Sequence, residues 1–187
     1  MESKITVFID IDDVLCVNTK FTGWDILSIY SREGDVLPDS QFVAHPIWKE
    51  IFLPEAISNL RKLHDEFHTD HGVQYVISSS WRTELTLRNF HDLFWRTGLD
   101  FVAKNLAEPE WSTPNHRSRL HDIEGWLQEY GAGQAVLVID DMASGTGLDR
   151  SRMDRARKVV LCEKNVGFVE SRYLRAVELL RYQLPKK

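Results

Sequence analysis

Three carboxylates follow a short apolar stretch near the start of the sequence, in the run ITVFIDIDDVLCV that covers residues 5–17. Asp10, Asp12 and Asp13 are almost adjacent in the chain. Like charges this close repel and raise one another's pKa, so the pattern predicts a positively charged partner at this point. Residues two apart at a strand end share a face, so Asp10 and Asp12 are expected to face one pocket.

Two later stretches also end in side chains that bind ions or phosphate. The run ISSSWR contains Ser78, Ser79 and Ser80, and the run VLVIDD ends in Asp140 and Asp141. Acids after one strand are also typical of turns and helix caps, but a second acidic strand end favours a metal. Several carboxylates, a hydroxyl and little basic charge predict Mg²⁺, which leaves ligand positions for water and a phosphate oxygen.

The elements that must position these residues alternate between strand and helix. Strands are predicted over 4–10, 73–79, 134–141 and 157–163, and helices over 53–67, 83–98, 119–132 and 170–183. This alternation indicates an α/β fold with a three-layer, Rossmann-like open sheet that is mainly parallel and covered by helices on both faces. Ligands of such folds bind at the carboxyl ends of the strands, where the acids and serines are expected to meet.

Composition narrows the class of protein. A chain of 187 residues with 43% hydrophobic and 27% charged residues is expected to form one domain spanning 1–187 and to be ordered. A net charge of −5 argues against binding nucleic acid chiefly through bulk basicity. Two cysteines and no apolar run of membrane-spanning length predict a cytoplasmic protein without membrane contacts. The histidines of the predicted helix at 53–67 and just after it, His64, His68 and His71, are expected to be solvated.

The paired aspartates at 10 and 12 are suited to phosphoryl transfer. This chemistry needs charge neutralisation, an in-line nucleophile and a proton for the leaving oxygen. An aspartate that attacks phosphorus forms an acyl phosphate. We therefore expect Asp10 to attack and Asp12, further along the loop, to protonate the leaving group, helped by a pKa that a crowded acidic site raises.

The run FIDIDDVL resembles the first motif of the haloacid dehalogenase (HAD) superfamily, and the order of the later motifs resembles that family too. The resemblance implies a phosphohydrolase in which Asp10 is the nucleophile and Asp12 the general acid/base. It also implies that Mg²⁺ is held by Asp10, Asp140 and the backbone carbonyl of Asp12, with help from Asp141. Within the superfamily, the runs ISSSWR, RLHDIEGWL, VIDD and KNVGF are similar to small domains that include those of RNA-repair proteins.

The same resemblance implies one serine and one cation that bind the phosphoryl group. Ser79 is favoured as the serine because it lies where the strand should end, with Ser78 as the runner-up and Ser80 also open. Arg119 is favoured as the cation, and Arg117 and Lys104 stay open. Arg82 is expected either to touch the substrate phosphate or to form a surface salt bridge. Asp13 replaces a frequent glycine of the motif and either adds charge beside the metal or faces solvent.

The substrate is less well defined by the sequence. The segment at about 16–46 is expected to be an irregular, flap-like insert, so the domain has no large cap and its site is open. An open site suits either a small phosphate ester or a phosphorylated nucleic-acid end or other macromolecule. Aromatic residues that flank the site are candidates for stacking on bases, although such residues more often close over a core; they are Phe21, Trp24, Tyr30, Trp48 and Trp111.

Two alternatives to a phosphohydrolase stay open at this point. One is a receiver-like phospho-acceptor domain, which also places acids, a hydroxyl and a lysine on a parallel sheet. A receiver takes phosphate on an aspartate after its middle strand, where this chain has VISSSWR. The other is a catalytically silent binding module on the same fold. The oligomeric state is not indicated by the sequence.

Overall fold

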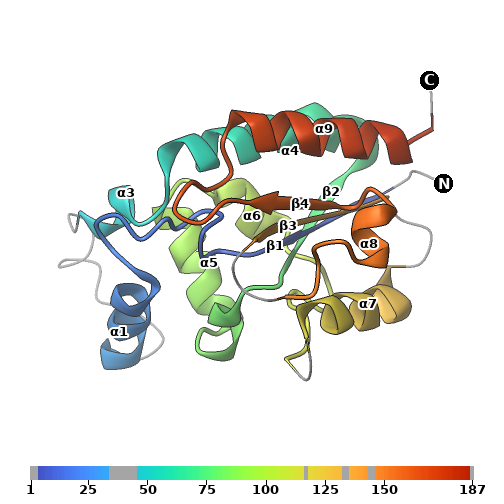
Figure 1. Cartoon of the computed structure of the whole chain (residues 1–187). Helices are drawn as coiled ribbons and strands as arrows, with labels where there is room; N and C mark the ends of the chain where they lie inside the picture. Colours follow the sequence, from blue (N-terminus) through green and yellow to red (C-terminus); the bar gives the residue numbers. More distant parts are fainter. Residues whose placement is uncertain (1–3, 34–45, 116–117, 132–134, 143–145, 186–187) are drawn as a thin grey trace.

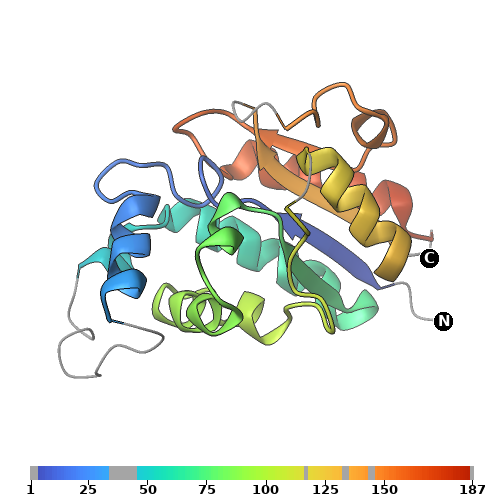
Figure 2. The same cartoon turned by 90° about the horizontal axis from the view of Figure 1, so that it is seen from below.

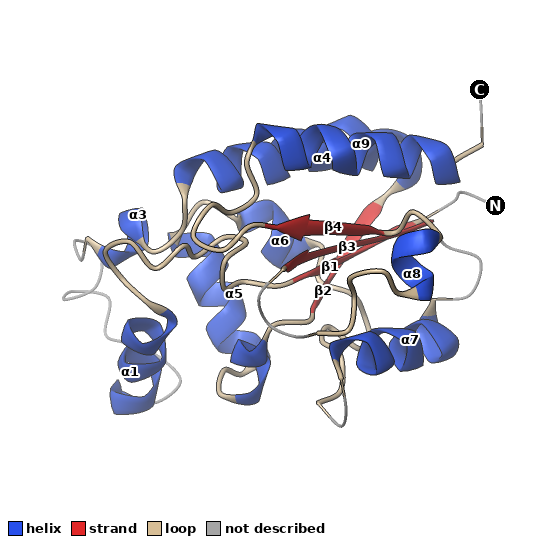
Figure 3. Ribbon diagram, in the orientation of Figure 1, coloured by secondary structure: helices blue, strands red, loops and turns tan. Residues whose placement is uncertain are grey.

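The computed structural model describes residues 4–33, 46–115, 118–131, 135–142 and 146–185. Its centre is a parallel sheet in the order β2-β1-β3-β4. The strands are β1 (Ile5–Ile9), β2 (Val73–Ile77), β3 (Ala135–Asp141) and β4 (Val159–Cys162). The predicted α/β class and Rossmann-like open sheet are confirmed, and every strand pair among the described residues is parallel (Figure 3).

Helices cover both faces of the sheet. Helices α4 (Pro54–His71) and α9 (Glu170–Gln183) lie on one face, and α7 (Arg119–Tyr130) and α8 (Arg152–Arg155) lie on the other (Figures 1 and 2). Because side chains alternate along a strand, β1 sends Val7 and Ile9 into the core under α4 and α9. Phe8 points the opposite way and packs edge-on against Trp126 of α7.

The outer edge of β2 is covered by the chain that follows α5 (Leu87–Arg96) and α6 (Asp100–Lys104). The backbone of Tyr75 bonds to Asn105 and Ala107, and that of Ile77 bonds to Trp111 and Thr113. This pairing occupies hydrogen-bonding groups that an edge strand would otherwise expose. It also brings the segment around Thr113 to the carboxyl end of β2, beside the serines.

Local signals explain most helix limits. Pro54 occupies the first turn of α4, and Gly72, with φ of 67°, ends that helix four residues beyond the predicted limit at 67. The helix predicted over 83–98 begins later, because Ser80–Thr83 forms a separate 3₁₀ turn, η1. Thr86 then caps α5 by accepting a hydrogen bond from the backbone N–H of Asn89.

The segment predicted to be irregular at 16–46 contains a helix, α1 (Gly23–Glu33), so that prediction was wrong for its described part. The side chain of Asp25 accepts hydrogen bonds from the backbone N–H and the hydroxyl of Thr22, which closes the first turn. Ile26 and Tyr30, one turn apart, are buried. Residues 34–45 of the insert lie outside the described residues, and a further short helix, α3 (Ile47–Glu50), follows them.

His64 also differs from its prediction, because it is buried rather than solvated. Its Nδ1 lies 3.2 Å from the hydroxyl of Tyr75, and its ring packs against Phe101. Burial, together with the charge of the neighbouring His68, lowers the pKa of His64 to about 4.

No helix among the described residues has both the length and the apolar character needed to cross a membrane.

Candidate active site

The carboxyl ends of β1, β2 and β3 meet at one edge of the sheet, as the strand order requires. The backbone N–H of Asp10 donates to Ile139 across the sheet at 3.0 Å, and that of Ser78 donates to Ile9 at 3.0 Å. These bonds continue the parallel pairing one residue past each strand. The first carboxylate and the serines are therefore fixed next to the acidic end of β3.

Three carboxylates form a buried cluster at this edge. Asp10, Asp140 and Asp141 each place an oxygen within 4.8 Å of the others, and all three side chains are buried. Burial is the main cause that raises the pKa of both Asp10 and Asp140; the charge of Asp141 raises both values, and the charge of Asp10 also raises that of Asp140. The excess negative charge therefore favours the binding of a cation.

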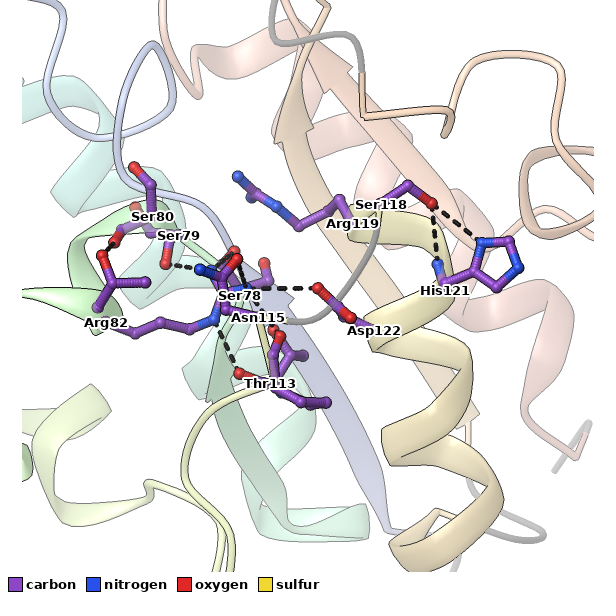
Figure 4. Close-up of polar contacts among 12 residues, drawn as sticks. Ser78, Ser79, Ser80, Arg82, Thr113, Asn115, Ser118, Arg119, His121 and Asp122 are labelled. Atoms are coloured by element: carbon purple, nitrogen blue, oxygen red, sulfur yellow. Dashed lines mark hydrogen bonds and ion pairs between the residues drawn. The ribbon is translucent and has the colours of Figure 1, made fainter.

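Arg119 is the cation that pairs with this cluster among the described residues. Its Nη1 lies 3.1 Å from Asp10 Oδ1 and 2.9 Å from Asp140 Oδ2. Burial opposes the charge of Arg119, but attraction from the two carboxylates outweighs that effect and raises its pKa. Arg119 is the first residue of α7, whose cap Ser118 accepts a hydrogen bond from the backbone of His121 (Figure 4).

The two other cations considered from the sequence are placed differently. Lys104 is at the end of α6, where it forms an ion pair with Asp100 at 3.1 Å and lies over the ring of Trp95. It has no contact with the carboxylate cluster among those the structure describes. Arg117 lies outside the described residues. The geometry therefore brings Arg119, rather than Lys104, to Asp10.

Asp12 and Asp13 have separate surroundings despite their adjacency. Asp12 accepts a hydrogen bond from the indole Nε1 of Trp81 at 2.9 Å, and burial raises the pKa of its carboxyl. Asp13 has a positive φ of 56°, and its Oδ1 accepts a hydrogen bond from the backbone N–H of Asn165. Asp13 is thus bound to the loop after β4 and does not belong to the carboxylate cluster.

The three serines also differ in their contacts. The side chain of Ser79 hydrogen-bonds to the carboxylate of Asp10 and caps η1 by accepting from the backbone of Trp81. The hydroxyl of Ser78 is buried and has no hydrogen-bond partner among the described residues. Ser80 is exposed and accepts, through its carbonyl, a hydrogen bond from Thr83. Ser79 is therefore the serine whose hydroxyl lies against Asp10.

Arg82 lies under the serine loop instead of on the surface. Its side chain is only 5% exposed, and Nη2 lies 3.6 Å from Asp122 of α7 (Figure 4). Its guanidinium donates to the backbone carbonyls of Ser78, Ser79, Thr113 and Pro114. The predicted surface salt bridge of Arg82 is therefore wrong, because the ion pair that it forms with Asp122 is buried. Contact between Arg82 and a substrate phosphate stays a prediction, and the hydrogen bonds of its guanidinium do not support it.

The sequence analysis did not predict two of these contacts. Trp81 is buried, and its bond to Asp12 follows only from the rule that a buried indole N–H finds an acceptor. Asp122, the partner of Arg82, stands in a helix that supplied only Arg119 as a candidate. Its spacing of three residues from Arg119 places both on one side of α7.

The carboxylate cluster fits a divalent metal by its chemistry. Three close oxygen donors on rigid strand ends are the kind of ligand set that Mg²⁺ takes, and one arginine cannot balance three carboxylates. Another cavity, of about 650 Å³, lies between α7 and α8, but none of these carboxylates lines it. The described residues that suit metal binding therefore lie together at the carboxyl ends of the strands.

A family model described as "HAD domain in Swiss Army Knife RNA repair proteins" matches residues 6–172. The match includes the four described strands, apart from Ile5 at the start of β1, and every residue of the carboxylate cluster. Neither a search of curated proteins nor one of solved structures found a match.

Proposed function

This chain belongs to the family of HAD domains in Swiss Army Knife RNA repair proteins, and on that premise we propose that it is a Mg²⁺-dependent phosphatase. Its substrate is a phosphate monoester at a nucleic-acid end, and its reaction passes through a phosphorylated aspartate. The observation that carries this proposal is the placement of Arg119 between Asp10 and Asp140 in a buried carboxylate cluster.

In the first step, a carboxylate oxygen of Asp10 attacks phosphorus and the bond from phosphorus to the ester oxygen breaks. Asp12 donates its proton to that leaving oxygen, so an alcohol departs and an aspartyl phosphate forms. Arg119 and the hydroxyl of Ser79, which both contact Asp10, are positioned to bind the phosphoryl oxygens. The bond of Asp12 to Trp81 fixes the direction of its carboxyl.

In the second step, water attacks the aspartyl phosphate while Asp12 takes up a proton from it. The bond between Asp10 and phosphorus breaks, and inorganic phosphate leaves. Mg²⁺ would be held by Asp10, Asp140, Asp141 and the backbone carbonyl of Asp12, and it supplies positive charge that lets a phosphate approach the carboxylates. Both aspartates thus return to their starting protonation states.

Phosphate release from a generic aryl phosphate tests this proposal. We expect turnover with Mg²⁺, none with a chelator, and a loss of about 10³-fold or more in kcat for Asp10→Asn. Asp13→Asn is the matched control, because Asp13 contacts the backbone of Asn165 and asparagine tolerates the same positive φ. That variant should keep most of the activity.

The two results that would contradict the proposal are distinct. Activity that survives in Asp10→Asn would show that another group attacks phosphorus. No release by the wild-type protein from the aryl phosphate, and none from phosphorylated oligonucleotide ends, would favour a catalytically silent binding module. The receiver-like alternative loses its support because the family match is to a HAD domain and because β2 is followed by serines instead of an aspartate.

A further inference from the structure

A cavity of about 520 Å³ opens beside Asp12, between the start of α1 and η1. Asp12 and Asn18 contribute to its wall from the loop after β1. The remaining described lining comes from the start of α1 and the residue before it, and from η1 and the residue after it. Because Asp12 is the proposed proton donor, this cavity lies on the side where the alcohol leaves.

The wall of the cavity is held by close packing at Trp81. A Cβ added to Gly23 would lie only 2.8 Å from the Trp81 ring, so α1 approaches that ring more closely than any other residue type would permit. The same indole donates its N–H to Asp12. Trp81 therefore links the first turn of α1 directly to the proposed acid.

Trp24 is the aromatic residue that this wall presents to solvent. Its exposed fraction is 79%, whereas Tyr30 and Trp48 are buried and pack against each other. Phe21 and Trp111, the other aromatic candidates from the sequence, are partly buried against the core. Of these five side chains, Trp24 alone combines exposure with a place in the cavity wall.

The charge of the cavity limits what it binds. Asp12 and Glu84 are acidic, and the described residues that line it include no lysine or arginine. A run of further phosphates would therefore be repelled. The side-chain amide of Asn18 offers a donor to a neutral polar group. The hydroxyl oxygens of Thr22 and Thr83, whose protons are donated to Asp25 and Ser80, offer acceptors. A flat, uncharged ring that carries donors and acceptors suits both these groups and an exposed indole.

We propose that this cavity binds the alcohol part of the substrate as a single nucleoside whose base stacks on Trp24. The proposal rests on the proposed function, because Asp12 marks the leaving-group side only if the protein is a phosphatase of the kind described. It assigns Trp24 the role of a specificity residue. Because the described lining includes no basic residue, the cavity takes the terminal nucleoside alone, and any continuing phosphodiester chain lies outside it.

A pair of substrates that differ only in the base tests the assignment. Adenosine 5′-monophosphate and ribose 5-phosphate share the same sugar phosphate, so the ratio of their kcat/KM values measures recognition of the base. We expect Trp24→Ala to lower this ratio about ten-fold, as loss of one stacked base does, without changing hydrolysis of ribose 5-phosphate. Trp95→Ala is the control, since Trp95 is 54% exposed on α5 and lies beside Lys104.

A binding measurement separates failure of this inference from failure of the proposed function. Adenosine, which carries no phosphate, should quench tryptophan fluorescence in wild-type protein and in Trp95→Ala, but not in Trp24→Ala. If neither phosphate ester is hydrolysed while this quenching is seen, the base site stands and the phosphatase proposal fails for these esters. Equal ratios in Trp24→Ala and wild type, or quenching that is unaltered by Trp24→Ala, would overturn the assignment of Trp24.

Discussion

Arg119 and Arg82 are both buried arginines that pair with aspartates near the same end of the sheet, but their surroundings differ in charge. Arg119 meets two of the three clustered carboxylates, so negative charge exceeds positive charge around it. Arg82 meets Asp122, and its other donors reach neutral backbone carbonyls. The region around Arg119 therefore has an excess of negative charge, whereas the charges of Arg82 and Asp122 balance each other.

This difference separates a region suited to binding ligands, around Arg119, from a region that holds the fold together, around Arg82. Each nitrogen of the Arg82 guanidinium has an acceptor, so the side chain joins the serine loop, the segment at 113–115 and helix α7 into one unit. Around Arg119, burial and then neighbouring carboxylates raise the pKa of Asp10 and Asp140, and the arginine offsets this rise only in part. Such an imbalance favours a cation, which in turn lets an anionic ligand approach, whereas a balanced pair favours rigidity.

Removal of Arg82 should have the largest effect on stability. Arg82→Leu leaves buried carbonyls and Asp122 without their shared donor, so the free energy of unfolding should fall by about 3–5 kcal/mol. Arg88→Leu changes an exposed arginine on α5 and should alter it by about 0.5 kcal/mol or less. Urea unfolding followed by circular dichroism gives both values. A similar effect of the two substitutions would show that Arg82 is not a support.

Addition of Mg²⁺ should have the next largest effect and should act only on the other region. At a concentration of about 100 times its Kd, a ligand that binds only the folded state adds about 2.7 kcal/mol to the free energy of unfolding. We therefore expect added Mg²⁺ to raise the Tm of the wild type and of Asp13→Asn, but not that of Asp140→Asn. An equal rise in Asp140→Asn would place the metal elsewhere.

The two arginines also differ in how well the sequence predicted their contacts. The mainly parallel sheet and the meeting of Asp10, Ser79 and Asp140 were predictable, because buried apolar runs and helical spacing define a parallel sheet whose strand ends converge. Arg119 was identified by its order in the chain, and the structure brings it to Asp10. Its catalytic role, like those of Asp10, Asp12 and Ser79, stays a prediction.

The features that were missed depend on contacts between distant segments. No local pattern indicates that Arg82 reaches the carbonyls at 113–114 or that Trp81 donates to Asp12, because these partners are set by how loops fold over the sheet. Helix α1 was missed for a different reason. Thr22 and Asp25 have the spacing of a capping box, but Gly23 inside that turn obscured the helical pattern.

His64 sharpens the comparison as a buried ionisable group that lies beside neither arginine. Its pKa is lowered to about 4, chiefly by burial, so its neutral form is favoured in the folded protein. Since the unfolded value is about 6.5, its contribution to stability is complete above pH 6.5 and is lost as the pH falls towards 4.

The free energy of unfolding should therefore decrease by about 1–2 kcal/mol between pH 7 and pH 5 on account of His64. His64→Gln should remove this part of the slope, whereas His91→Gln, which alters a partly exposed histidine on α5, should keep it. Urea unfolding at a series of pH values measures the slope. If His64→Gln left it unchanged, the buried ring would be charged in the folded state.

Matched substitutions of Asp140, beside Arg119, and of Asp122, beside Arg82, test the comparison most directly. Their expected effects are the smallest. In chelator, Asp140→Asn removes the carboxyl whose charged form is disfavoured by burial and by the charges of Asp10 and Asp141, so the free energy of unfolding should rise by about 1 kcal/mol. Asp122→Asn weakens the balanced pair with Arg82, so the free energy should fall by about 1 kcal/mol. Urea unfolding resolves a difference of sign. Destabilisation by both substitutions would mean that Arg119 already compensates the cluster, and the distinction between the two arginines would fail.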